Sequence, residues 1–214
     1  MPKPNIILAF DVETTGLLPK NRCAPLSEYP KILQLSFVLY DIEQRRVIQT
    51  YNEYIRVSDE TVIEQFITDL TGITAQICSV RGVPIENALA AFYEAYMSCD
   101  CVIAHNLTFD KKMLEIEIQR NFDKVAHIPS MPFVFNQTFN DVHGIDSVCT
   151  MNLGKDQCDL WIENANGRKW KKNPKLSELH QHLFGSIPEN LHDALADTVI
   201  CLRCFLKMQF GITL

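Results

Sequence analysis

The chain has 214 residues, of which 47% are hydrophobic and 21% charged, and its formal net charge is −6. This balance is ordinary for a soluble globular protein with room for one α/β domain, and the acidic charge taken alone argues against a nucleic-acid partner. No apolar run approaches the roughly 18 residues of a membrane span, and the N-terminal residues contain no signal-peptide cleavage site. We therefore expect an intracellular protein, cytoplasmic or nuclear, with no membrane partner.

The first part of the chain predicts three strands and then helices. Residues 6–10 form a short continuous apolar run, which is typical of a buried central strand. Residues 32–40 and 46–57 are rich in β-branched and aromatic side chains and are separated by a polar turn, which predicts an antiparallel hairpin. Apolar residues then recur at helical spacing over residues 61–70 and 84–97.

The second part of the chain predicts two more strands with helices between and after them. Residues 101–104 read as a buried strand, and residues 108–122 as a helix for which Thr108 is a plausible N-cap. Irregular structure is expected over residues 123–140. The remaining elements are a last strand over 145–151 and helices over 176–183 and 193–208. This order predicts an α/β fold in which helices flank a mixed five-stranded sheet.

Eight cysteines are scattered along the chain, and they do not form a zinc-site pattern. Cys201 and Cys204 lie one turn apart in an amphipathic helical pattern. We interpret both as small buried hydrophobic residues in a reducing compartment.

Carboxylates follow both central strands. Asp11 and Glu13 come at the end of the first strand, where side chains two residues apart point to the same face. Two acids this close repel each other unless a cation lies between them. Asp110 follows the strand over 101–104 and opens a helix. Taken alone, the first pair reads as solvated acids and Asp110 as an acid that favours a helix N-terminus.

A histidine and a further carboxylate lie near the start of the last predicted helix. Asp197 lies beside the apolar stripe of that helix, where an acid is costly unless it is paired or coordinates a metal. His192 is five residues earlier, and five helical residues turn about 500°, so the two side chains would not share a helix face. His192 is therefore expected at the helix entrance, on a loop with Pro188 and Asn190 that can swing toward the site.

These fragments, in this order, resemble the motifs of the DEDDh (DnaQ-like) 3′–5′ exonucleases, the family of the proofreading epsilon subunit of bacterial DNA polymerase III. The residues that carry the resemblance are Asp11 and Glu13 followed by Thr14-Thr15-Gly16-Leu17, His105 and Asn106 followed by Phe109-Asp110, and His192 with Asp197. The resemblance runs from residue 6 to about residue 208, and it implies a ribonuclease-H-like fold in one exonuclease domain, residues 1–214. Residues 155–175 form a basic insertion relative to that family.

The resemblance implies a hydrolase that removes nucleotides from a 3′ end by a two-metal mechanism. Asp11, Glu13, Asp110 and Asp197 are then the expected ligands of two Mg²⁺ or Mn²⁺ ions, which prefer hard oxygen ligands. His192 is the expected base for the attacking water, a task that suits an unperturbed pKa of about 6.5. The expected products are nucleoside 5′-monophosphates.

The residues that follow these motifs are expected to bind the strand terminus. Backbone groups near Thr14 and Thr15 are candidates to bond the 3′ hydroxyl, and Leu17 is a candidate wedge against the terminal base. Phe109 either stacks near the sugar or base, or packs into the core beneath the helix start. The same alternatives of substrate contact or structural support apply to His105 and Asn106.

The insertion contains a run of cations around an aromatic residue: Arg168, Lys169, Trp170, Lys171 and Lys172. Such a run is most often a solvated face. The alternative is a guide for the phosphate backbone, with Trp170 stacking on a base.

Single-stranded or frayed 3′ ends of DNA are the expected substrate, within a possible polymerase or repair complex. The same chemistry on RNA remains open, because discrimination rests on contacts to the 2′ hydroxyl. A non-catalytic module that binds nucleic acid or a polymerase is the alternative of another class, and the five filled catalytic positions argue against it. A metal-dependent phosphatase is a third alternative, but it does not explain why His192 and Asp197 are five residues apart.

Overall fold

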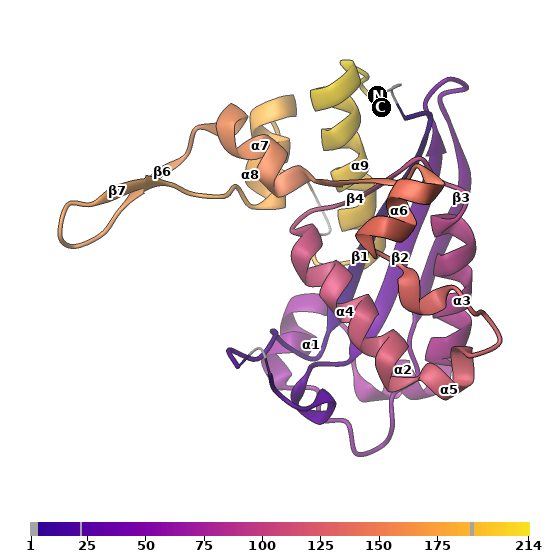
Figure 1. Ribbon diagram of the computed structural model, residues 1–214. Coiled ribbons are helices and arrows are strands. Elements are labelled where there is room, and N and C mark those ends of the chain that lie inside the picture. The colour runs from indigo at the N-terminus through magenta and orange to yellow at the C-terminus, as the bar shows by residue number, and fades with distance from the viewer. Residues whose placement is uncertain (1–3, 22, 189–190) are drawn as a thin grey trace.

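The computed structural model describes residues 4–21, 23–188 and 191–214. Its centre is a mixed five-stranded sheet in the spatial order β3-β2-β1-β4-β5 (Figure 1). The strands are β1 Ile6–Thr14, β2 Ile32–Asp41, β3 Arg46–Tyr54, β4 Cys101–Ala104 and β5 Asp146–Cys149. The first three strands form an antiparallel meander, whereas β4 is parallel to both β1 and β5. The predicted α/β fold with a mixed sheet is confirmed.

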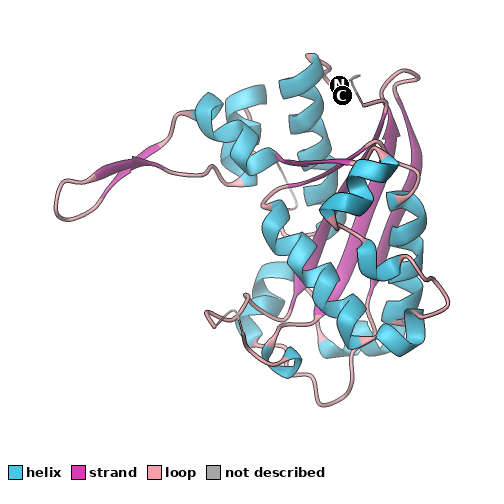
Figure 2. Ribbon diagram, viewed as in Figure 1, coloured by secondary structure: helices cyan, strands magenta, loops and turns pink. Residues whose placement is uncertain are grey.

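Helices pack on both faces of the sheet (Figure 2). In chain order the α-helices are α1 Gln65–Thr71, α2 Ala75–Arg81, α3 Ile85–Tyr96, α4 Leu107–Arg120, α5 Phe122–Val125, α6 Gln137–His143, α7 Thr150–Cys158, α8 Leu176–Phe184 and α9 Ala194–Phe210. Two short 3₁₀ turns, Leu26–Glu28 and Met131–Phe133, lie in the connections. Among the described helices, none combines the length and the apolar character that crossing a membrane requires.

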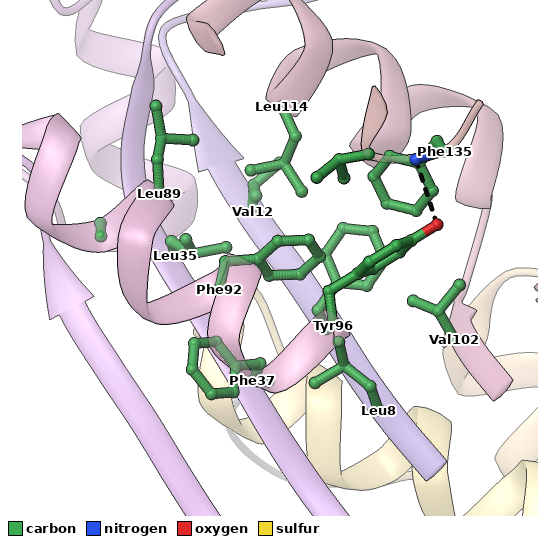
Figure 3. Close-up of a cluster of buried hydrophobic side chains, with 14 of the residues drawn as sticks. Leu8, Val12, Leu35, Phe37, Leu89, Phe92, Tyr96, Val102, Leu114 and Phe135 are labelled. Carbon is green, nitrogen blue, oxygen red and sulfur yellow. Dashed lines mark hydrogen bonds between the residues drawn. The ribbon is translucent and has the colours of Figure 1, made fainter. Parts of the chain in front are cut away.

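The alternation of side chains along β1 separates two cores. Leu8, Phe10 and Val12 point to one face, where they pack with residues of α3 and α4. Figure 3 shows this cluster, in which the ring of Phe92 lies against that of Phe10 with centroids 5.0 Å apart. The hydroxyl of Tyr96 accepts a hydrogen bond from the backbone N–H of Phe135 at 3.1 Å, so its polar end is satisfied within this core.

The other face of β1 is covered by α9. Ile7 and Ala9 pack there against buried residues of α9, including Cys201 and Phe205. Cys201 and Cys204 are both buried free thiols, which confirms their interpretation as small hydrophobic residues. The position of α9 follows from this packing, so the sheet fixes the helix that carries the last of the candidate site residues.

Several helix boundaries differ from those predicted. α4 starts at Leu107, and its N-cap is Asn106 in the left-handed region (φ 73°), so the prediction of Thr108 as the N-cap was wrong. The chain must reverse directly after β4, and asparagine tolerates that backbone conformation better than most residues. α2, α5, α6 and α7 were not predicted, because each is short or carries few apolar residues. The prediction of irregular structure over 123–140 was therefore wrong where α5, the 3₁₀ turn and the start of α6 lie.

The predicted insertion is a helix end followed by a hairpin. Residues 155–158 complete α7, and the basic run lies on a separate two-stranded sheet made of β6, Trp161–Glu163, and β7, Lys169–Lys171. Asn164 closes the turn by accepting hydrogen bonds from the backbone N–H groups of Asn166 and Arg168, both at 3.0 Å. Figure 1 shows this hairpin projecting from the body of the protein.

Candidate active site

Three elements bring the predicted carboxylates to one end of the sheet. Asp11 and Glu13 share a face of β1 near its carboxyl end, and β4, parallel to β1, ends beside them. The turn through Asn106 starts α4 there and directs Asp110 inward, where the side chain is 3% exposed. The backbone N–H of Val12 hydrogen-bonds the Asp110 carboxyl, which fixes the second motif against the first.

The start of α9 brings the third motif to the same place. Asp193 caps this helix by accepting a hydrogen bond from the Ala196 backbone N–H at 3.0 Å, and Asp197 lies one turn further on. His192 precedes the cap with a positive φ of 68°, and its backbone N–H donates to Asp197 Oδ2 at 3.3 Å. Ligand atoms of Glu13, His192 and Asp197 all lie within 4.8 Å of one another. Asn190, which we predicted to belong to this loop, lies outside the described residues.

The clustered acids perturb one another. Asp11 retains some accessible surface, yet the surrounding protein desolvates its carboxyl and, with the charges of Asp197 and Asp193, raises its pKa to about 8. Burial and then Asp11, Asp197 and Asp193 raise the pKa of Glu13 to about 9. Burial and the charge of Asp11 raise the pKa of Asp110 well above its usual value, and burial also raises the pKa of Asp197. Such mutually raised pKa values are typical of carboxylates that share a cation site.

One orphaned atom supports a metal at this position. Asp197 Oδ1 is buried and has no hydrogen-bond partner within the described residues. A buried carboxylate oxygen without a donor is unfavourable unless a cation takes the donor's place. Oxygen ligands of this kind suit Mg²⁺ or Mn²⁺, so the residues present fit the divalent cations that the sequence predicted.

Metal-free protein should lose stability as pH rises. The folded-state pKa values of Asp11 and Glu13 are raised to about 8 and about 9, whereas their unfolded values are near 4. Between these limits the folded protein keeps protons that the unfolded chain releases, so the free energy of unfolding falls with rising pH. We expect thermal unfolding in EDTA to show a Tm several degrees lower at about pH 8 than at about pH 5. An equal or higher Tm at the alkaline pH would contradict the coupling.

Sequence analysis assigned no role to Asp193, which the structure adds to the cluster. Its Oδ2 accepts a hydrogen bond at 3.3 Å from Nε2 of the buried Gln34 on β2. Its charge raises the pKa of Asp11, Glu13 and Asp197. Asp193 is the first residue of the helix predicted over 193–208, and an acid at a helix start is a typical N-cap signal that was available in the sequence.

The residues that follow Asp11 and Glu13 differ in how accessible their groups are to a ligand. Leu17 is 86% exposed, so an apolar side chain stands free beside the acids. Thr14 is buried and its hydroxyl donates to the Gly16 carbonyl at 2.7 Å. The Thr15 backbone N–H donates to the Lys31 carbonyl at 2.9 Å, and its hydroxyl accepts from the Lys31 N–H at 3.0 Å. The N–H of Thr15 is therefore already engaged.

Three residues of the second motif, His105, Asn106 and Phe109, differ in their contacts and exposure. His105 Nδ1 lies 3.1 Å from Thr150 Oγ1, and its Nε2 lies 3.1 Å from the Pro174 carbonyl oxygen. Burial lowers the pKa of His105 to about 4, so the ring is neutral near pH 7. Phe109 is partly buried against the main core, and the side chain of Asn106 is exposed. These contacts favour structural support for His105.

Most of the cations in the predicted backbone guide are paired with acids. Lys169 Nζ lies 3.4 Å from Glu163, and Lys172 Nζ lies 2.5 Å from Glu178. Lys171 Nζ lies 2.9 Å from both Asp156 and Asp159. The hairpin therefore has far less free positive charge than its sequence suggests, because its neighbouring segments bring acids to it.

Comparison with known proteins agrees with this arrangement. The family model described as Exonuclease (RNase_T) matches residues 8–205. Two curated relatives are DNA polymerase III PolC-type proteins, from Streptococcus suis (strain 98HAH33) with 32% identity over 114 residues and from Streptococcus mutans serotype c (strain ATCC 700610 / UA159) with 30% over 115 residues. Each match covers 53% of this chain and 7% of the relative, so the chain corresponds to a small part of those proteins.

Solved structures of Escherichia coli Exonuclease I have the same fold. The complex with a dT13 oligonucleotide aligns with a TM-score of 0.68 and 20% identity, over 95% of this chain and 41% of that one. The zinc-bound form of a complex with single-stranded DNA aligns with a TM-score of 0.67 and 19% identity, over 98% and 42%. The family match confirms the resemblance to DnaQ-like exonucleases.

Proposed function

Because the chain belongs to the RNase_T exonuclease family, we propose that it removes nucleotides one at a time from the 3′ end of single-stranded DNA. The observation that carries this proposal is the convergence of four carboxylates with mutually raised pKa values around the unpartnered Asp197 Oδ1. We further propose that residues 1–214 form a single exonuclease domain, with the β6–β7 hairpin as an appendage to it.

Asp11, Glu13, Asp110 and Asp197 would hold two Mg²⁺ or Mn²⁺ ions. Asp11 would be the central ligand of this set, since the charge of Asp197 raises its pKa and its own charge raises the pKa of Asp110. Bound divalent cations would neutralise the phosphate charge and make the attacking water more acidic. The four carboxylates would hold the positive charge of the cations at the carboxyl end of β1.

His192 would accept the proton of the attacking water. The water oxygen forms a bond to phosphorus, and the bond from phosphorus to the 3′ oxygen of the preceding nucleotide breaks. The imidazole takes a proton from the water, and the leaving 3′ oxygen takes a proton from solvent. The products are a nucleoside 5′-monophosphate and a strand that carries a new 3′ hydroxyl. His192 suits this role because it is exposed and a ring nitrogen lies within 4.8 Å of carboxylate oxygens of Glu13 and Asp197.

Residues beside the acids would recognise the strand terminus. Leu17 is the candidate wedge against the terminal base, since it is almost fully exposed. Backbone groups near Thr14 would bond the 3′ hydroxyl, and Phe109 would line the sugar with the part of its ring that the core leaves open. The engaged N–H of Thr15 and the hydrogen bonds of His105 support a positioning role for these two residues, without contact to the substrate.

Two likenesses support DNA as the substrate over RNA. The curated relatives are DNA polymerases by name, and the Exonuclease I structures contain DNA oligonucleotides. By the same likeness we propose a polymerase or repair complex as the setting in which this chain acts.

Gel analysis of 5′-labelled single- and double-stranded DNA and RNA tests this function. With Mg²⁺ we expect a ladder that shortens from the 3′ end of single-stranded DNA, and with EDTA an intact strand. A ladder on RNA alone would replace DNA by RNA as the substrate. Intact substrates under all conditions would instead favour a binding module that lacks catalysis.

A further inference from the structure

The two faces of the β6–β7 hairpin differ in chemistry. Cross-strand partners share a face, and the register pairs Trp161 with Lys171, Ile162 with Trp170 and Glu163 with Lys169. The backbone N–H of Lys172 donates to the Leu160 carbonyl at 2.9 Å, so the alternation continues to the root. One face, the paired face, therefore carries Trp161, Glu163, Lys169 and Lys171. The opposite face, the open face, carries Ile162, Arg168, Trp170 and Lys172.

The paired face is satisfied by the protein itself. Its two lysines form ion pairs with Glu163, Asp156 and Asp159. Lys171 Nζ also lies 6.0 Å from the centre of the Trp161 ring, and Trp161 Nε1 donates to Asp159 Oδ1 at 3.1 Å. This face offers a ligand little free charge, and its tryptophan is held in place.

The open face offers an aromatic ring and a cation. Trp170 is 42% exposed and its neighbour Ile162 is 39% exposed. Arg168 is exposed and forms no ion pair with any residue that the structure describes. An accessible indole beside a free guanidinium is the combination that binds single-stranded nucleic acid, because any base can stack on the ring while the cation meets the phosphate.

The root of the hairpin lies beside the second motif. Thr150, which begins the outgoing segment, and Pro174, which ends the returning one, both contact the ring of His105, five residues before Asp110. Lys172, on the open face, reaches Glu178 at the start of α8, and α8 packs on α9. The root of the open face is therefore connected through α8 to α9, the helix that carries Asp197.

We propose that the open face holds the single strand on the 5′ side of the terminal nucleotide, with a base stacked on Trp170 and a phosphate paired with Arg168. This inference rests on the proposed function and adds a strand-holding surface outside the carboxylate cluster. Such a surface binds long strands better than short ones, because a short strand ends before it reaches the hairpin.

The two tryptophans of the chain allow each face to be observed separately, since Trp161→Phe leaves only Trp170 and Trp170→Phe leaves only Trp161. We expect an oligo(dT) of about 20 nucleotides, in EDTA, to quench the fluorescence of Trp161→Phe strongly, as stacking requires. The matched Trp170→Phe protein should show little quenching. Equal quenching of both proteins, or no quenching of Trp161→Phe at saturation, overturns the proposal.

Binding affinities give an independent readout. Trp170→Ala should weaken binding of the long oligo(dT) about tenfold, as loss of one stacked base does, and bring its Kd toward that of an oligomer of about four nucleotides. Arg168→Ala should reduce the slope of log Kd against log salt by about 0.7, the value for one lost phosphate contact. The controls Trp161→Ala and Lys169→Ala, on the paired face, should leave the long-to-short ratio unchanged.

Failure of this proposal can be separated from failure of the proposed function. The p-nitrophenyl ester of thymidine 5′-monophosphate reports on the carboxylate cluster without an upstream strand. If the wild-type protein hydrolyses the ester but the open-face variants keep wild-type length dependence, the hairpin does not hold the strand, and a protein partner becomes the occupant of Trp170. If neither the ester nor DNA is hydrolysed, the proposed function itself is wrong.

Discussion

Asp11→Asn is expected to lower kcat on single-stranded DNA by at least about 10³-fold with Mg²⁺ present. A cation pair provides several kcal/mol of transition-state stabilisation, and about 1.4 kcal/mol corresponds to each tenfold change in rate. Asparagine keeps the size of the side chain but removes the charge that would bind the cations. Single-turnover hydrolysis of a 5′-labelled oligonucleotide measures the effect. Turnover near that of the wild type would contradict the assigned role.

The same substitution should stabilise the metal-free protein. At neutral pH the native state must either keep Asp11 protonated or hold its charge near Asp193 and Asp197, whereas asparagine does neither. Since one pKa unit corresponds to about 1.4 kcal/mol, a gain of more than about 1 kcal/mol in the free energy of unfolding is expected at pH 7. The gain should vanish below about pH 3, where the carboxyl is neutral in both the folded and the unfolded state.

A matched control separates these effects from the general loss of a carboxylate. Asp141 lies exposed on α6 and accepts a hydrogen bond from Gln137 at 2.7 Å, outside the acid cluster. Asp141→Asn should leave turnover unchanged and give no stabilisation. Equal stabilisation by both substitutions would show that net charge alone is responsible.

His192→Asn is expected to lower kcat by about 10²–10⁴-fold, the usual contribution of a general base. Asparagine is the suitable replacement because it tolerates the positive φ of 68° found here. The Kd for Mn²⁺, measured by thermal shift in the absence of DNA, should change little if His192 acts as a base. A large loss of Mn²⁺ affinity would instead make His192 a metal ligand, which its place within 4.8 Å of Glu13 and Asp197 also permits.

His192→Gly provides the control for the backbone. Glycine adopts positive φ freely and lacks the imidazole, so it should reproduce the loss in His192→Asn. If His192→Gly were far less active than His192→Asn, the position of the loop rather than the imidazole would account for the loss.

The sequence predicted the position of the acids because strand geometry dictates it. Period two along β1 places Asp11 and Glu13 on one face, and the parallel neighbour β4 ends beside them. Asp197 was predicted from its place beside an apolar stripe, and α9 does pack its buried residues on the sheet. The alternation along a strand, the parallel pairing of β1 with β4 and the apolar stripe of a helix were therefore sufficient to predict these positions.

The remaining features depend on tertiary contacts that no local pattern encodes. α7 contains Gly154, a poor helix former, yet a Cβ there would come within 2.6 Å of Leu179 Cδ1, so close packing of α8 explains both the glycine and the helix. Likewise, the charge of Lys171 could not be discounted from sequence, because the Asp156 that pairs with it lies 15 residues earlier.

The contacts of His105 have a consequence for protein engineering. The Pro174 carbonyl can only accept, so Nε2 carries the proton, and the unprotonated Nδ1 lies 3.1 Å from the Thr150 hydroxyl, which itself donates to the Ala104 carbonyl at 3.3 Å. The uncharged ring of His105 thus holds the two ends of the segment 150–174 together, directly after the carboxyl end of β4. We therefore expect that a hairpin of different length or sequence can replace residues 160–172 without moving Asp110, which would make the hairpin an exchangeable module for binding other nucleic-acid strands.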